Sequence, residues 1–212
     1  TEYSLLDGMC KIKKMMPLLK DMGQTACAMT DHGNMYGTID FYKAAKKEGI
    51  KPIIGCEVYT AARTRFDKER EYDASSGHLV LLCKNMDGYR NLIEMVSFAN
   101  MEGFYYKPRV DMELLRKYHE HLICLSACLA GDVPQKLLAD DYEGAKKVAL
   151  EYLDIFGEGN YYLEIQDHGL EEQKKVNEGL LRLSKETGIP LVATNDAHYM
   201  RKSDAKAQRV LV

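Results

Sequence analysis

At two places in the sequence, an apolar run is followed by an aspartate and a histidine. Asp31 and His32 follow one such run, and Asp196 and His198 follow another. These side chains are costly to place beside buried strands unless they have a partner, and a metal ion is the obvious one. In extended chain, the spacing of Asp196 and His198 puts both on one side. The second pair therefore favours a site, whereas the first is equally consistent with a turn aspartate and a hydrogen-bonded histidine.

A carboxylate and an imidazole also occur at strand-like runs. Glu57 lies within "IIGCEVYT", and a glutamate in a strand covered on both faces must point to solvent or to a site. We favour the site. His78 opens the run "HLVLLC", where a histidine at a strand edge is nearly as good an explanation. His168 follows the strand-like run "LEIQD", so its position after a strand makes it as good a candidate for a ligand as His32. The remaining histidines, His119 and His121, are interpreted as surface residues.

The donor types indicate which metals would bind. The six cysteines lie mostly in apolar runs without a CxxC pair, which is typical of buried thiols in a reducing compartment. The spacing of Cys124 and Cys128 alone is weak evidence for a metal site. A mixture of His, Asp and Glu ligands suggests two or three catalytic Zn, Mn or Fe ions rather than a closed structural zinc site. Such a cluster activates water and binds a phosphoryl group.

The segments that must position these residues alternate between strands and helices. Hydrophobic periodicity predicts strands at 25–29, 52–59, 79–83, 122–125, 161–165 and 191–194. It predicts helices at 38–48, 88–101, 142–156 and 171–187, each followed by a glycine that suits a left-handed cap. This alternation indicates an α/β fold with a parallel sheet, doubly wound or closed as a barrel. The absence of a GxGxxG or GxxxxGK[ST] loop and the polar residues after several strands favour the barrel.

Length and composition set further limits. We expect one domain over residues 1–212, and the net charge of -3 excludes a generally basic nucleic-acid wrapper. No apolar run is long enough for a membrane helix, so we expect a cytosolic protein without a membrane partner. Lys107 and Arg109 could bind DNA phosphate, but a lone basic pair is more often ordinary surface. The charged segment 61–77 is expected to be a mobile excursion.

Taken together in order, the motifs resemble a known family. "TEYSLLDG", "TDHGNMYG", "GHLVLL", "GFYYKPRVD", "LSACLAGDVP" and "ATNDAHY" are similar to the amino-terminal PHP (polymerase and histidinol phosphatase) domains of bacterial DNA polymerase III alpha subunits. The resemblance implies a distorted (β/α)7 barrel with three metal ions. It implies ligands at Asp7, His32, Glu57, His78, Cys128, Asp196 and His198, and a positioning role for Asp31. Family members carry a His-x-His pair on a first strand just before Thr1, so we expect that strand to be truncated and fewer ions to bind.

The resemblance also implies functions. A whole subunit would carry out DNA-templated DNA synthesis with DNA and other holoenzyme subunits as partners. The domain itself would hydrolyse phosphoesters, as a 3'-5' exonuclease that proofreads DNA. The alternative is a non-catalytic scaffold that stabilises the polymerase and docks a separate proofreading exonuclease subunit. A free-standing histidinol-phosphate phosphatase is disfavoured, because "GFYYKPRVD" and "EIQDHGLEEQ" resemble polymerase chains.

Overall fold

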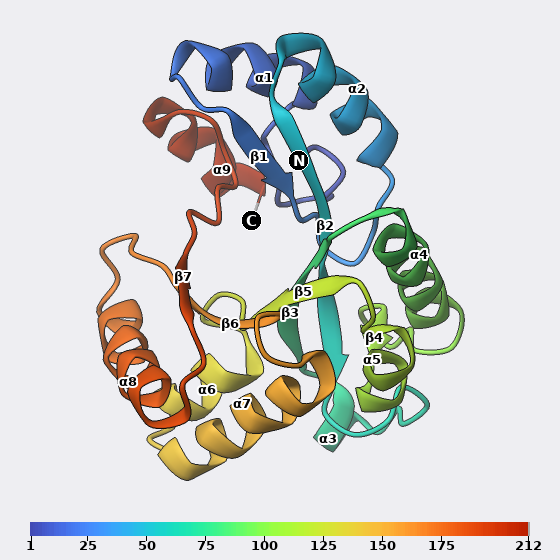
Figure 1. Ribbon diagram of the computed structural model, residues 1–212, viewed down its shortest axis with the longest axis vertical. Helices are drawn as coiled ribbons and strands as arrows, with labels where there is room; N and C mark the ends of the chain where they lie inside the picture. The colour runs from blue at the N-terminus through green and yellow to red at the C-terminus, as the bar shows by residue number, and fades with distance from the viewer. Residues whose placement is uncertain (212) are drawn as a thin grey trace.

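A single curled sheet organises the molecule. The computed structural model describes residues 1–211, which form a seven-stranded sheet in the order β1-β2-β3-β5-β6-β7, with β4 paired to β2. The strands are β1 Ala26–Met29, β2 Lys51–Ala61, β3 Ser76–Cys83, β4 Arg109–Val110, β5 Leu122–Leu125, β6 Tyr161–Ile165 and β7 Leu191–Ala193. The sheet curves through more than half of a ring, as Figure 1 shows.

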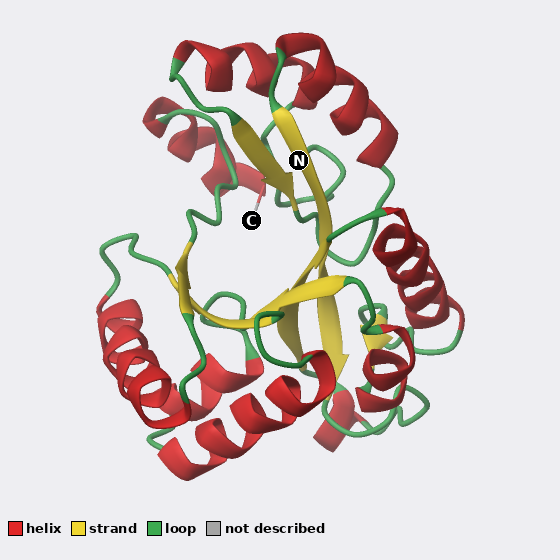
Figure 2. Ribbon diagram, in the orientation of Figure 1, coloured by secondary structure: helices red, strands yellow, loops and turns green. Residues whose placement is uncertain are grey.

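Helices surround the outside of the curled sheet (Figure 2). They are α1 Ile12–Asp21, α2 Thr38–Glu48, α3 Arg70–Asp73, α4 Met86–Met101, α5 Met112–Tyr118, α6 Asp132–Leu138, α7 Tyr142–Phe156, α8 Glu171–Thr187 and α9 Ala205–Leu211, with a 3-10 turn η1 at Lys202–Asp204. The largest apolar core lies between α4–α8 and β2, β3, β5 and β6. A second core packs α1 and α2 on β1 through Met16, Met29 and Phe41. In residues 1–211, no helix is long and apolar enough to cross a membrane.

The predicted elements are confirmed, and one prediction about their direction is wrong. All six predicted strands and all four predicted helices are present within a few residues of their expected ends, whereas β4 and several short helices, among them α3, α5, α6 and α9, were not predicted. The sheet is not wholly parallel, because β3 runs antiparallel to both β2 and β5. An apolar run specifies that a strand is buried but carries no information about its direction. The link between β2 and β3 brings the chain back beside β2 instead of crossing over the sheet.

The reversed direction of β3 has a consequence for the polar residues. In a parallel sheet, the first residue of a strand lies at the edge opposite to the carboxyl ends. Because β3 is antiparallel, its early residue His78 pairs with Tyr59, near the carboxyl end of β2. Glu57 and Tyr59 are two apart on β2 and therefore share one face with His78. The fold thus brings His78 to the same edge as the residues that follow β1 and β7.

The barrel type of fold is confirmed as a curled sheet that is open on one side. In the described residues, β1 and β7 do not pair with each other. A cavity of about 730 Å³ lies inside the curve, with apolar lining from Val80, Leu125 and Val192 and polar lining that includes Glu164 and Thr194. The segment that precedes α1 crosses this open side, where the Met9 amide donates to the His198 carbonyl at 2.7 Å. A strand before Thr1 stays a prediction.

The charged segment 61–77 is anchored to the domain and includes α3. The prediction of a mobile excursion did not foresee this short helix or the contacts that hold the segment. The buried Arg109 guanidinium donates to the carbonyls of Gly103, Arg65, Asp67 and Asp73 at 2.8–3.3 Å. Arg63 in turn binds both carboxylate oxygens of the buried Asp73, at 2.5 and 3.1 Å. The buried Arg109, with its four backbone acceptors, and the buried Asp73 hold this segment, although most of its other charged side chains are exposed.

The Asp73 carboxylate should make stability depend on pH. The Arg63 guanidinium holds the pKa of Asp73 below its ordinary value of 3.8. In the unfolded chain this carboxylate protonates near 3.8, so the contribution is present above that pH and is lost as the pH falls through the lower folded-state value. We expect the free energy of unfolding to fall less steeply with acid in Asp73→Asn than in the unchanged chain. Urea unfolding between pH 2.5 and 6 measures this; parallel curves would contradict it.

Candidate metal centre

The structure brings the seven residues that the resemblance nominates to one edge of the sheet. Glu57 comes from β2 and His78 from β3, whereas the other residues lie on segments adjoining strands. His32 follows β1, Cys128 follows β5, and both Asp196 and His198 follow β7, while Asp7 lies on the segment before α1. Because β3 is reversed, these positions all fall at the carboxyl edge of the parallel strands. Loops at this edge are where barrel folds place their active sites.

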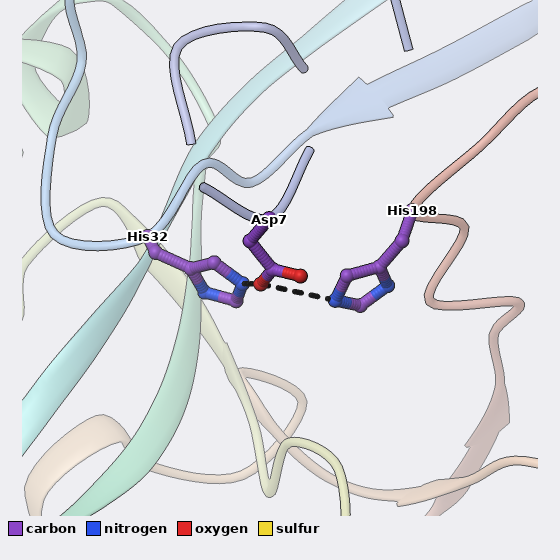
Figure 3. Close-up of side chains that lie close together, drawn as sticks. All are labelled: Asp7, His32 and His198. Atoms are coloured by element: carbon purple, nitrogen blue, oxygen red, sulfur yellow. Dashed lines mark hydrogen bonds and ion pairs between the residues drawn. The ribbon is translucent and has the colours of Figure 1, made fainter. Parts of the chain in front are cut away.

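One group of possible ligands joins both sides of the open sheet. The Asp7 Oδ2 atom lies 2.7 Å from His32 Nε2 and 3.4 Å from His198 Nε2. Figure 3 shows the Asp7 carboxylate between the two imidazoles, with His198 reaching it from the far side of the opening. One atom from each of the three residues lies within 4.8 Å of the other two, which is close enough for a single ion to contact all three.

A second group of possible ligands, which includes the buried Glu57, is less exposed than the first. Glu57 Oε1 is 2.5 Å from His78 Nδ1, and Cys128 Sγ is 3.6 Å from the same nitrogen. These three atoms also lie within 4.8 Å of one another. Glu57 Oε1 is 3.5 Å from His32 Nδ1, so the two groups adjoin through His32 and Glu57. The separate nitrogen atoms of His32 therefore face the two groups.

Asp196 lies at the edge of this centre. Its Oδ1 atom is 3.7 Å from His198 Nδ1, and it belongs to neither group of possible ligands in the described part of the chain. Its backbone has a φ of 44°, an unusual conformation that turns the chain between Asp196 and His198. Burial, followed by the negative charge of Glu57, raises the pKa of Asp196. A nearby cation would offset both effects.

Burial and charge oppose each other at the centre. Burial would raise the pKa of Glu57, but the neighbouring imidazoles of His32 and His78 outweigh it and lower the pKa to about 2. Burial would lower the pKa of His32, whereas Glu57 and Asp7 raise it above its ordinary value. Burial raises the pKa of the Cys128 thiol to about 12. Without a cation this thiol is neutral, and coordination to a metal is the usual way to deprotonate such a group.

Asp31 holds the segment that carries Asp7. Its buried carboxylate accepts from the hydroxyls of Thr1 and Ser4 at 2.7 and 2.6 Å, and Ser4 Oγ accepts from the His32 amide at 3.1 Å. The positioning role expected of Asp31 agrees with these contacts. On the other side of Asp7, the Gln208 amide of α9 donates to the Asp7 carbonyl and, at 3.3 Å, to its Oδ1.

Several other candidates lie outside the centre. His168 Nε2 is 2.7 Å from the Asn195 carbonyl and its Nδ1 is 2.8 Å from Gln173, so it braces the loop after β7. His121 lies at a helix-to-strand turn near Asn85. Cys124 is buried in the main core. Arg109 is fully buried and donates four hydrogen bonds to backbone carbonyls, so it is not available at the surface to a phosphate.

One buried acid was not nominated from the sequence. Glu164 lies on β6 and lines the cavity. Within residues 1–211 it forms no ion pair, and its Oε2 atom has no hydrogen-bond partner. Its Oε1 accepts from Gln166 Nε2 at 3.1 Å and from the Thr194 hydroxyl. Burial raises the pKa of Glu164. The signal used for Glu57, a carboxylate inside an apolar strand, would also have found Glu164 in "YYLEIQ".

The residues present fit divalent metal ions. Two buried atoms at the junction of the groups, His32 Nδ1 and Glu57 Oε1, have no partner with hydrogen-bonding geometry among the described residues. Buried polar atoms are rarely left in this state unless something binds them. The available donors are imidazole nitrogens, carboxylate oxygens and one sulfur, a set that suits Zn, Mn or Fe better than Ca or Mg.

A curled α/β sheet with possible metal ligands at the carboxyl ends of its strands is typical of barrel-type hydrolases. A model of the PHP domain family matches residues 1–168, and the chain belongs to that family. Over its whole length it is 49% identical to DNA polymerase III subunit alpha of Treponema pallidum and 47% identical to that of Thermus aquaticus. It spans only 18% of the length of either relative.

Solved structures support the fold. A Bifidobacterium adolescentis protein with the proposed activity of a metal-dependent phosphoesterase matches with a TM-score of 0.54 at 11% identity, over 97% of this chain and 92% of that one. An amidohydrolase from Chromobacterium violaceum matches with a TM-score of 0.52 at 13% identity, over 91% of this chain and 83% of that one. At such identities the likeness concerns the fold alone.

Proposed function

We propose that the chain is the PHP domain of a replicative DNA polymerase III alpha subunit, occupying residues 1–212, and that it hydrolyses phosphodiesters at the 3' end of DNA. The observation that carries the hydrolytic proposal is the convergence of two adjoining groups of possible ligands on the described structure. The full-length similarity to alpha subunits supports the rest. The whole subunit would synthesise DNA in the bacterial cytoplasm, together with other holoenzyme subunits.

Different side chains of this centre would hold different metal ions. Asp7, His32 and His198 would hold one ion, and Glu57, His78 and Cys128 a second. Asp196 would orient His198 or complete the coordination of a further ion. Divalent ions in such a centre supply an activated water and polarise the phosphoryl group. Because the pKa of Glu57 is about 2, its carboxylate is ionised at neutral pH and is ready to bind a cation.

The second candidate function is a scaffold that stabilises the polymerase and docks a separate proofreading exonuclease subunit. The pairing of His32 with Asp7 and of His198 with Asp7 ties both sides of the open sheet together. A metal ion held there would fasten these segments without catalysing a reaction. Under this alternative, bound ions contribute to the stability of the domain, and DNA ends are left uncut.

Metal content and cleavage together test the proposal. The chain of residues 1–212, loaded separately with Zn, Mn and Fe and then dialysed, is analysed by plasma emission spectrometry. It is then assayed with each metal on a primer-template whose primer is labelled at its 5' end. We expect bound metal and stepwise shortening from the 3' end, and loss of both in His32→Ala. His121→Asn is the matched control, because His121 is an exposed histidine with a φ of 61°, which asparagine tolerates.

The outcomes separate the two candidates. Metal binding with no shortening, either by this chain or by the full-length subunit, would contradict the hydrolytic function and favour the scaffold. Binding of the exonuclease subunit by the full-length protein, lost when residues 1–212 are deleted, would support docking. Absence of bound metal in both forms would contradict the metal centre itself.

A further inference from the structure

The loop between α4 and β4 carries exposed aromatic rings. Phe104 and Tyr106 have exposed fractions of 54% and 61%, although large apolar side chains of this size usually pack inside a protein. The Tyr105 ring lies 4.7 Å from the Tyr106 ring, with an angle of 60° between their planes. Lys107 follows at once and is also exposed. The loop therefore presents aromatic faces and a cation side by side.

This loop is held in a fixed shape. Arg109 donates through Nε to the Gly103 carbonyl at 3.0 Å, and the Tyr105 amide donates to the Lys107 carbonyl at 3.0 Å. A side chain at Gly103 would place its Cβ 2.0 Å from the Arg109 carbonyl oxygen, so only glycine fits. Tyr106 adopts a φ of 59°, which is strained for an aromatic residue. A strained conformation kept in place by its surroundings suggests a function for the exposed side chain.

The loop lies beside the candidate metal centre. The Lys107 ammonium is 5.2 Å from the centre of the Tyr59 ring, and that ring is 5.2 Å from the ring of His78. A Cβ at Gly33, the residue after His32, would lie 2.8 Å from Pro108. Within residues 1–211, the ammonium of Lys107 forms no ion pair with a carboxylate. An unpaired cation next to possible metal ligands is well placed for a phosphate.

We propose that Phe104, Tyr106 and Lys107 bind the single-stranded 3' end of DNA and deliver its last phosphodiesters to the metal centre. This inference rests on the proposed hydrolytic function and adds the residues that would bind the DNA strand and the requirement that its bases be unpaired. Aromatic rings stack on bases regardless of sequence, and a nearby cation binds the backbone phosphate. A small phosphate ester would need the centre and the cation but would have no contact with two outward-facing rings. The arrangement thus favours a polymer with exposed bases.

Binding can be measured without cleavage. Fluorescence anisotropy of a labelled twelve-nucleotide DNA with phosphorothioate linkages, in the presence of Mn²⁺, gives the Kd of the chain. We expect Tyr106→Asn, which keeps the unusual φ accessible, to weaken binding about tenfold, because one lost stacking contact has about that effect. Phe104→Ala should behave similarly. A duplex of the same sequence hides its base faces and should be bound weakly, with little change in Tyr106→Asn.

The contribution of Lys107 can be measured separately, through the dependence of Kd on salt concentration. Lys107→Gln should reduce the slope of log Kd against log salt concentration by about 0.7, the change for one phosphate contact on a single strand. Lys117→Gln is the matched control, because the Lys117 ammonium also lies 5.4 Å from an aromatic ring, that of Phe98, but on α5. It should leave both affinity and slope unchanged. A matched RNA strand tests the choice of DNA, and tighter binding of RNA would contradict it.

Cleavage of two substrates separates this inference from the proposed function. With Mn²⁺, Phe104→Ala and Tyr106→Asn should cleave the ordinary oligonucleotide about tenfold more slowly at low substrate and lose far less on bis-p-nitrophenyl phosphate, whereas Lys107→Gln should slow cleavage of both substrates. If the unchanged chain cleaves neither substrate, the hydrolytic function fails while the anisotropy result still decides the DNA site. The DNA site is overturned if the chain does not bind the oligonucleotide, or if Phe104→Ala, Tyr106→Asn and Lys107→Gln combined bind it as well as the unchanged chain.

Discussion

Glu57→Gln should remove most of the metal-binding capacity of the chain. Glu57 Oε1 lies 2.5 Å from His78 Nδ1 and 3.5 Å from His32 Nδ1, so this one oxygen faces both groups of possible ligands. Glutamine keeps the shape but loses the charge. Changes in residues that merely orient a metal ligand weaken binding by about 10- to 100-fold, so loss of a direct ligand should cost at least about 100-fold. Plasma emission spectrometry after dialysis measures the retained metal.

Glu164→Gln is the matched control for this prediction. Glu164 is also a buried glutamate of the sheet and also lines the cavity, but it belongs to neither group of possible ligands in the described residues. We expect it to retain the metal content of the unchanged chain. Both variants should keep the circular dichroism of the folded chain. Equal metal content in Glu57→Gln and the unchanged chain would contradict the assignment of Glu57.

Metal retention should also fall with acid. The ligands bind metal only when deprotonated, and Glu57 and Asp7 raise the pKa of His32 above its ordinary value of 6.5. Protons therefore compete with the metal for His32 from near-neutral pH downwards. This competition should appear in the unchanged chain as progressive release of ions below about pH 7, measured by the same spectrometry. Metal retention should therefore change at a much higher pH than the acid-dependent stability expected from Asp73.

Arg109→Ala should be among the most destabilising single changes. The guanidinium is fully buried and donates to four backbone carbonyls, which belong to Gly103, Arg65, Asp67 and Asp73. Alanine would leave these acceptors without their donor and would open a cavity between the two segments. Each unsatisfied buried acceptor costs about 1–3 kcal/mol, so we expect a loss of at least about 3 kcal/mol in the free energy of unfolding. Urea unfolding measures it.

An exposed arginine provides the comparison. Among the residues that the structure describes, Arg90 on α4 pairs only with Asp87, at 3.1 Å, and both side chains are largely exposed. Arg90→Ala should change the free energy of unfolding by no more than about 0.5 kcal/mol. Arg109→Lys should remain strongly destabilised, because an ammonium cannot reach acceptors on both sides as a planar guanidinium does. A loss below about 1 kcal/mol in Arg109→Ala would contradict the anchoring role.

Most helices and strands could be predicted because their signals are local in the sequence. The apolar run at 52–59 and the helical periods ending at Gly49 and Gly188 appear in the structure as β2, α2 and α8, and both glycines adopt a φ of 76°. The two-residue strand β4 is too short for any period to appear. Gly103, two residues after the end of α4, does not adopt the left-handed conformation; the close approach of the Arg109 carbonyl is what requires glycine there. That requirement arises from a contact between residues six apart, which no local pattern contains.

For the candidate site, the sequence by itself determined which residues are chemically able to bind a metal, because ligand type is a property of the side chain. It also placed His32, Asp196 and His198 after apolar strands. Only the tertiary structure decided which of them meet. The direction of β3 brings His78 to Glu57, and the segment before α1 brings Asp7 to His198, 191 positions away in the chain. Strand direction and long-range approach depend on packing of the whole chain, since apolar runs encode burial without specifying neighbours.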